Sequence, residues 1–217
     1  TAVTMVAGLI SSFFAVPPPV YLQMLVIELL AYLLPISLYA KENRLLTVRE
    51  AREGFGLKRC KNTLIPWIIL AGFGCQFVMI VLNLPLNLLL GQSDGFIPQT
   101  PWELTMAILV LGIVPAVFEE FLLRGIVYGV MAEFNSRVAL LFTTVMFALM
   151  HGSPAGFAGY LFLGAILVLL LRRTGSLYAC ILFHLVNNVT ALLLSYFSNE
   201  LFDTPVGTLQ LFAFGVA

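Results

Sequence analysis

Six polar residues interrupt long apolar segments of the sequence, and their side chains are of kinds that move protons or stabilise charge. They are Glu119, Glu120, Arg124, His151, His184 and Asn188. Carboxylates and imidazoles serve as general bases and acids, and imidazole or amide donors stabilise a developing oxyanion where bulk water is excluded. The set therefore predicts acid–base chemistry at a site inside an apolar environment.

The stretch FEEFLLR places three of these charges within six residues. Each charge at the centre of a membrane helix costs roughly 2.5–3.5 kcal/mol, so these side chains must face protein or a water-filled cavity. Glu120 and Arg124 stand four residues apart on one helical face and are predicted to pair. Glu119 is rotated by about 100° from Glu120, so it can point elsewhere and stay chemically available.

Four of the polar groups are predicted to share one depth in the membrane. Counted from the cytoplasmic ends of their helices at about 1.5 Å per residue, Glu119, His151 and Asn188 each lie roughly 21 Å deep, and His184 about 15 Å. A lone intramembrane His or Asn is more often an interhelical hydrogen bond than a catalyst. The shared layer favours a functional site over scattered packing residues.

The segment that carries both glutamates, residues 103–134, is too long for one straight span and contains Gly112 and Pro115. A break there would place Glu119 and Glu120 in the first turn of a new half-helix, whose positive dipole end favours a carboxylate. A simple kink or a tilted long helix fits the sequence as well.

The remainder of the chain predicts a membrane as the surrounding medium. Of its 217 residues 60% are hydrophobic and only 10% are charged, whereas a soluble domain carries roughly a quarter charged residues. Apolar runs reach the ~20 residues that a spanning helix needs. We predict a single membrane domain over residues 1–217, an all-α transmembrane bundle of about eight spans. The predicted spans are 1–16, 20–40, 64–90, 103–134, 138–152, 154–171, 176–197 and 204–217.

Charge distribution predicts the orientation of this bundle. Seven of the eleven basic residues lie in the hydrophilic loop 41–63, within which residues 47–57 are expected to form a short interfacial helix. Alternation of the spans places Arg137 and the pair Arg172–Arg173 on the same side, which the positive-inside rule makes cytoplasmic. Both termini are expected there too. The net charge is zero, so nothing indicates a nucleic-acid partner.

Three short motifs then carry a resemblance to a known family. They are Glu-Glu-x-x-x-Arg at 119–124, Phe-x-x-x-His at 147–151 and His-x-x-x-Asn at 184–188. In order, spacing and placement in successive spans they resemble the motifs of the CAAX-protease and bacteriocin-processing family (CPBP or Abi), which includes the Ras-converting CAAX endopeptidases. Any one motif is weak and the three together are specific. The resemblance covers roughly residues 60–200, the expected catalytic core.

The resemblance implies a membrane-embedded endopeptidase with a water-filled chamber. By this analogy Glu119 is the general base that activates a water, and His151 helps to hold that water. His184 and Asn188 would polarise the scissile carbonyl and stabilise the oxyanion. The supporting pair would be Glu120 and Arg124.

The resemblance leaves metal dependence open, because the family has been described both as metalloproteases and as glutamate-dependent proteases. No zincin-type His-Glu-x-x-His occurs in the sequence. We therefore expect a mechanism without a cofactor. The alternative is a zinc ion held by Glu119, Glu120, His151 and His184.

Rival functions also remain. Cys180, His184 and Asn188 stand at successive i, i+4 positions, so a cysteine peptidase is conceivable. It would leave the glutamates and His151 without a role. A non-catalytic membrane binding or immunity protein of the same fold is another alternative, and a transporter a third, since intramembrane ionisable groups also line substrate paths. Glu28, alone in the second predicted span, is interpreted as a packing or cavity residue.

Substrate and location are expected from the resemblance and from the short chain with compact loops. We expect a bacterial cytoplasmic-membrane protein that contacts the lipid bilayer. Its substrate is expected to be a peptide or small membrane protein, as in CAAX-type cleavage or in bacteriocin and peptide maturation.

Overall fold

The computed structural model describes residues 20–45, 47–91 and 97–201, and all regular structure within these ranges is helical. Among them, five helical segments are long and apolar enough to cross a membrane, and Ser136–Met150 is a shorter apolar helix. The five are Tyr21–Glu42, Asn62–Leu90, Pro101–Phe134, Phe157–Thr174 and Leu177–Ser198. The predicted all-α membrane fold is thus confirmed. The predicted count of eight is not, since the first and last predicted spans lie outside the described residues.

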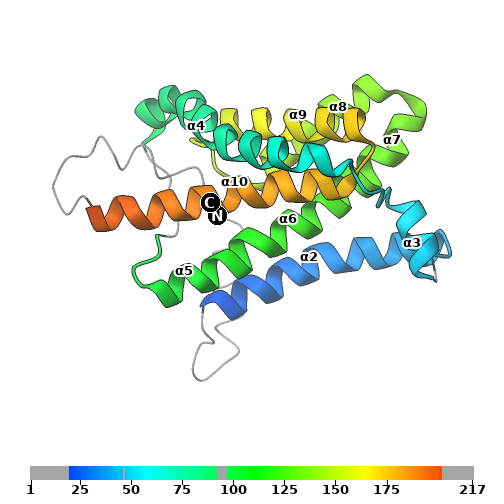
Figure 1. Ribbon diagram of the computed structural model, residues 1–217, viewed down its shortest axis with the longest axis horizontal. Coiled ribbons are helices and arrows are strands. Elements are labelled where there is room, and N and C mark those ends of the chain that lie inside the picture. Colours follow the sequence, from blue (N-terminus) through cyan, green and yellow to red (C-terminus); the bar gives the residue numbers. More distant parts are fainter. Residues whose placement is uncertain (1–19, 46, 92–96, 202–217) are drawn as a thin grey trace.

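The described elements follow one another along the chain as shown in Figure 1. They are α2 (Val20–Glu42), α3 (Val48–Gly54), η1 (Asn62–Leu64), α4 (Ile65–Leu90), α5 (Pro101–Ala107), η2 (Ile108–Ile113), α6 (Val114–Glu119), η3 (Glu120–Val127), α7 (Tyr128–Phe134), α8 (Ser136–Met150), α9 (Phe157–Thr174) and α10 (Leu177–Leu201).

Helix α10 lies in the middle of the bundle (Figure 1). It packs against α4 and α9 on one side and against η2, α6 and η3 on the other. Helix α8 packs on α9, and α2 lies at the periphery against η2, α6 and η3. This arrangement brings the three motif-bearing segments, α6–η3, α8 and α10, next to one another.

The segment Pro101–Phe134 is one uninterrupted helix that alternates between α and π geometry. In the π-helical segments η2 and η3 the turn widens, so the Val114 N–H donates to the Leu109 carbonyl and the Tyr128 N–H to the Leu123 carbonyl, each five residues earlier. The half-helix predicted to begin near Gly112 and Pro115 does not form. The widened turn η2 accommodates Pro115 within a continuous helix.

Polar side chains mark where helices begin. Thr100 precedes α5 and its hydroxyl accepts from the Glu103 N–H, with Pro101 at the first helical position. Asn135 separates α7 from α8, and its side-chain oxygen accepts from the N–H groups of Arg137 and Val138. These caps fix where the chain turns between motif-bearing helices.

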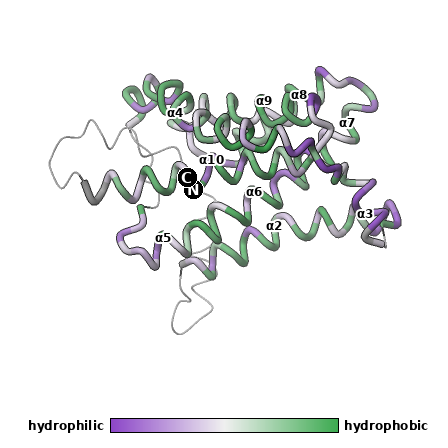
Figure 2. Tube along the Cα trace, viewed as in Figure 1, coloured by the Kyte–Doolittle hydropathy of each residue, from purple (hydrophilic) through white to green (hydrophobic). Residues whose placement is uncertain are grey.

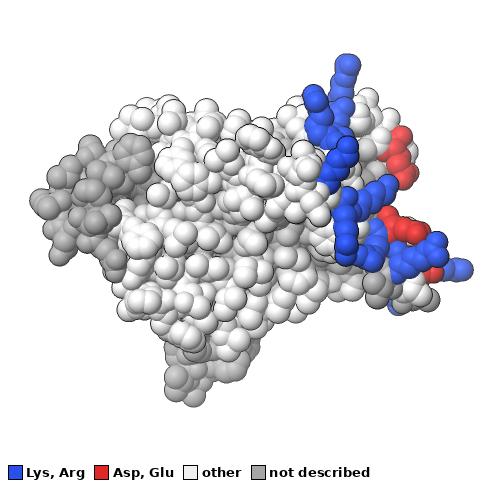
Figure 3. Space-filling view, in the orientation of Figure 1, with Lys and Arg blue, Asp and Glu red and all other residues white. Residues whose placement is uncertain are grey.

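Charged residues gather at one end of the molecule. The helices are hydrophobic along most of their length, and hydrophilic residues lie around α3 and the α7–α8 junction (Figure 2). On the face shown in Figure 3, the Lys and Arg side chains gather at that same end. A short helix, α3, is present in the basic loop where one was predicted, and Gly56 follows it with a left-handed φ of 66°.

The basic loop is folded onto the helices rather than extended away from them. Phe55 is 6% exposed, and its ring lies 5.6 Å from that of Tyr39 and 5.3 Å from that of Phe121. The Ser176 hydroxyl at the start of α10 donates to the Lys58 carbonyl. The loop therefore packs on the charged end of the bundle, where Phe55 contacts Phe121, the residue that follows Glu120.

Candidate active site

The carboxylate of Glu120 is the centre of a buried ionic cluster. Its Oε1 lies 2.9 Å from Nη1 of Arg124 and 2.9 Å from Nδ1 of His184. The Glu120 and Arg124 side chains are both 0% exposed. Arg124 also donates from Nη2 to the Gly164 carbonyl (3.2 Å), and its Cζ lies 4.6 Å from the centre of the Phe147 ring. The predicted Glu120–Arg124 pair is confirmed, and His184 joins it across the helix interface.

Glu119 points away from this cluster, as its 100° offset predicts. It is 6% exposed, and its Oε1 accepts a 2.9 Å hydrogen bond from the Tyr32 hydroxyl on α2. The carboxyl of Glu28, one turn before Tyr32, interacts electrostatically with Glu119. Oε2 of Glu119 is buried and has no hydrogen-bond partner among the residues that the structure describes. This oxygen is therefore free to accept a proton.

His151 lies at the end of α8 in a stack of rings. Its Nδ1 lies 2.8 Å from the Phe147 carbonyl oxygen, which can only accept, so Nδ1 carries the proton. In the neutral ring Nε2 is then the basic nitrogen. The ring stacks on Tyr160 at 3.9 Å and lies 4.5 Å from the Phe147 ring. Because the Phe147 ring also lies against Arg124, the first and second motifs meet.

Asn188 lies one turn beyond His184 on α10, facing the π-helical segment η2. Its Nδ2 lies 3.5 Å from the Leu111 carbonyl and 3.4 Å from the Gly112 carbonyl. Pro115 has no N–H to donate to the carbonyl of Leu111, four residues earlier, so a side-chain donor suits this position. No hydrogen bond joins Asn188 to the glutamates or histidines within the described part of the chain. Its amide is turned toward the helix backbone.

The sequence analysis did not identify several buried polar residues that lie near the motifs. Tyr32 is one, although it shares a helical face with Glu28 at an i, i+4 spacing that could have indicated it. Another is the pair Gln76–Asn187, in which the Asn187 amide donates to Gln76 Oε1 at 3.0 Å and links α4 to α10. Asn83 of α4 accepts the Gly159 N–H at 2.7 Å. Such contacts join helices whose packing the sequence pattern did not reveal.

The donor groups do not fit a zinc site. Within the described ranges, no group of three or more His, Cys, Asp or Glu side chains is arranged to hold a metal ion. Oε1 of Glu120 is bound by Arg124 and by Nδ1 of His184. This nitrogen of His184 is therefore not available as a metal ligand. Protein donors hold Oε1 of Glu119 and Oε1 of Glu120, and the His151 Nδ1 faces the Phe147 carbonyl.

Cys180 lacks the partner that a nucleophilic thiol needs. It is fully buried, and its Sγ lies 3.4 Å from the Leu167 carbonyl and 3.6 Å from the Ser176 carbonyl. His184 makes its contact with Glu120 instead. The arrangement disfavours the cysteine-peptidase alternative.

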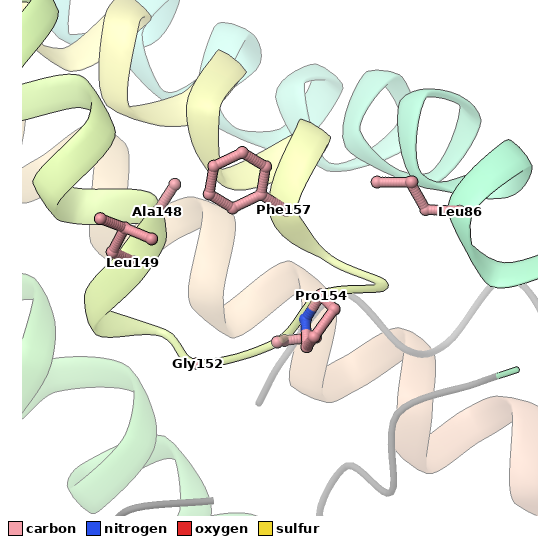
Figure 4. A pocket seen from close by; sticks show the side chains of 7 residues that line it. Leu86, Ala148, Leu149, Gly152, Pro154 and Phe157 are labelled. Carbon is pink, nitrogen blue, oxygen red and sulfur yellow. The ribbon is translucent and has the colours of Figure 1, made fainter. Parts of the chain in front are cut away.

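An apolar pocket of about 390 Å³ lies beside the end of α8, next to His151 along the chain. Figure 4 shows Phe157, Leu149 and Ala148 on one side of it, with Leu86 of α4 and Pro154 opposite. Gly152 and Ser153 complete its lining. An apolar side chain or lipid segment could occupy it close to the candidate site.

Comparison with known proteins gives one match to a protein-family model. The model of the type II CAAX prenyl endopeptidase family, Rce1-like, matches residues 101–190, from the start of α5 into α10. No curated protein and no solved structure matches the chain.

The apolar helices, together with this match, point to an integral membrane protein. The match over residues 101–190 supports membership of the CAAX protease family.

Proposed function

We propose that this protein is an intramembrane endopeptidase that hydrolyses a peptide bond with a water activated by Glu119. The observation that carries the proposal is the Glu119 carboxylate, buried in a membrane helix with Oε1 held and Oε2 without a partner. A general base needs an oxygen that is positioned and still able to accept a proton. Oε2 of the neighbouring Glu120 also lacks a partner among the described residues, but its Oε1 is bound by Arg124 and His184, whereas Glu119 has a single neutral hydroxyl donor. We therefore assign the base to Glu119 and the role of counter-ion to Glu120.

In this mechanism His151 holds the attacking water. Its Nδ1 donates to a backbone carbonyl, so its neutral Nε2 can accept a hydrogen bond from water. The Glu119 carboxylate then removes a proton from that water, whose oxygen forms a bond to the scissile carbonyl carbon. The proton passes on to the leaving amine as the peptide C–N bond breaks.

His184 and Asn188 are proposed as donors to the oxyanion. Because His184 Nδ1 faces Glu120, its Nε2 is the nitrogen that can point at substrate, and it donates when the ring is charged. The Nδ2 of Asn188 carries two hydrogens and lies 3.4–3.5 Å from the carbonyls of Gly112 and Leu111, so substrate binding has to direct one of these hydrogens toward the oxyanion.

The proposed substrate is a membrane-associated peptide or protein, of CAAX type or from peptide maturation. The proposed orientation places the Lys- and Arg-rich end of Figure 3 in the cytoplasm. A cysteine introduced at Arg59, with Cys60 replaced by Ser and the buried Cys75 and Cys180 left in place, should react with an impermeant maleimide only after the cells are opened. Labelling of intact cells would reverse the orientation.

The test compares wild type with Glu119→Ala on quenched fluorescent peptides, including a farnesylated CAAX peptide, in detergent and with or without a strong chelator. Glu133→Ala is the matched control, because Glu133 is an exposed carboxylate on the same continuous helix. We expect cleavage by wild type and by the control, insensitive to chelator, and none by Glu119→Ala.

Each other result changes the assignment. Loss of wild-type cleavage on chelation would make the protein a metalloprotease. Cleavage that survives Glu119→Ala would remove the catalytic role of this carboxylate. If no peptide is cleaved, the non-catalytic binding or immunity alternative becomes the better account.

A further inference from the structure

Helix α2 lies outside residues 101–190, which carry the family match, and yet it reaches the candidate base. We propose that Tyr32 of α2 is a positioning residue: its hydroxyl holds Oε1 of Glu119, so that Oε2 is the oxygen presented to the reacting water. This inference rests on the role proposed above for Glu119.

The contact has the geometry that positioning requires. Tyr32 is 9% exposed and Glu119 6%, and the hydroxyl donates to Oε1 over 2.9 Å. A hydrogen bond to a charged acceptor is stronger than one between neutral groups, and in a site without bulk water it fixes the plane of the carboxylate. No other hydrogen bond holds either carboxylate oxygen of Glu119 within the described residues. Orientation of the base therefore depends on this one hydroxyl.

A second carboxyl lies beside this contact. Glu28 stands one turn before Tyr32, and its carboxyl interacts electrostatically with both Tyr32 and Glu119. The Tyr32 hydroxyl is the donor that Glu119 receives from α2, since an ionised carboxylate can only accept.

The packing of α2 argues against a role in stability alone. Among the five described spans, α2 has the smallest buried share, 11%, against 33–50% for the others. It packs on η2, α6 and η3, and most of its surface faces outward. One of its few buried side chains meets the candidate base directly.

The experiment measures kcat and KM for wild type, Tyr32→Phe and the matched control Tyr39→Phe. Tyr39 lies on the same helix, packs against Phe55, and makes no side-chain hydrogen bond in the described part of the chain. We expect Tyr32→Phe to lower kcat by roughly 10- to 100-fold, as the loss of a hydrogen bond to a charged group predicts. KM should match that of the control.

A kcat of Tyr32→Phe equal to that of Tyr39→Phe, with Glu119→Ala inactive, would overturn the inference and leave the proposed function intact. An active Glu119→Ala would overturn both. A double-mutant cycle of Tyr32→Phe and Glu119→Gln on thermal unfolding in detergent needs no substrate. The coupled pair should give non-additive shifts of the midpoint, and additive shifts would contradict the contact.

Discussion

Gly72 of α4 lies where this helix crosses α10, and an added methyl group there tests how closely the site is packed. A Cβ at Gly72 would lie 2.8 Å from the Phe183 carbonyl oxygen and 3.1 Å from Cβ of Val186. The obstacle at Phe183 is backbone, which a rotamer change cannot move. Gly74, two residues along the same helix, would meet nothing within 4 Å. Comparing Gly72→Ala with Gly74→Ala therefore separates the effect of close packing on stability from the effect of helix propensity, which both variants share.

The size of the effect follows from these distances. Ordinary contact begins at 3.4 Å, so α4 and α10 must separate by about 0.6 Å to accept the methyl group at Gly72. Overpacking of this kind costs about 1–3 kcal/mol. Replacing Gly by Ala within a helix stabilises both variants by up to about 1 kcal/mol, and this gain cancels in the comparison. We expect Gly72→Ala to be about 1–3 kcal/mol less stable than Gly74→Ala.

Thermal denaturation of the purified variants in detergent measures the difference, expected as a midpoint roughly 2–12 °C lower for Gly72→Ala. Because Phe183 precedes His184, peptide cleavage should fall in Gly72→Ala as well and stay unchanged in Gly74→Ala. Equal midpoints for the two variants would refute the close approach of α4 and α10.

Three further outcomes follow from the contacts. Arg124→Gln leaves Glu120 buried without its guanidinium partner, so the free energy of unfolding should fall by about 3–5 kcal/mol in a denaturation assay. Cys180→Ser should retain peptide cleavage, because the thiol faces backbone carbonyls, and an inactive variant that still folds would revive the cysteine mechanism. Asn83→Ala removes the acceptor of the Gly159 N–H at the start of α9 and should cost about 1–3 kcal/mol, measured by thermal denaturation against wild type.

The local part of the site could be predicted from the sequence, because helical geometry alone determines it. The i, i+4 spacing of Glu120 and Arg124 predicts their ion pair, and the 100° offset predicts that Glu119 faces elsewhere. Both are confirmed. The catalytic roles assigned to these residues stay predictions.

Contacts between helices could not be read from the sequence. His184 and Arg124 both contact Oε1 of Glu120, which depends on which face of α10 packs against η3. The hydrophobic pattern of one helix does not contain this information. The two π-helical segments were missed for a different reason: a periodicity of 3.6 residues was assumed throughout, and the i, i+5 turn around Pro115 replaces the break that a proline suggested. Tyr32 was missed because its partner lies 87 residues away.

A single oxygen atom, Oε1 of Glu120, accepts hydrogen bonds from both Arg124 and His184. The effects of substitutions at these three positions should therefore depend on one another. A substitution at any one leaves the other two with an unmatched charge or donor in a dry interior. Once one member is lost, losing a second should add little further harm. Natural variants of this protein are therefore expected to change these positions jointly or to keep them all, and a replacement drawn from a relative succeeds only when the trio is transferred together.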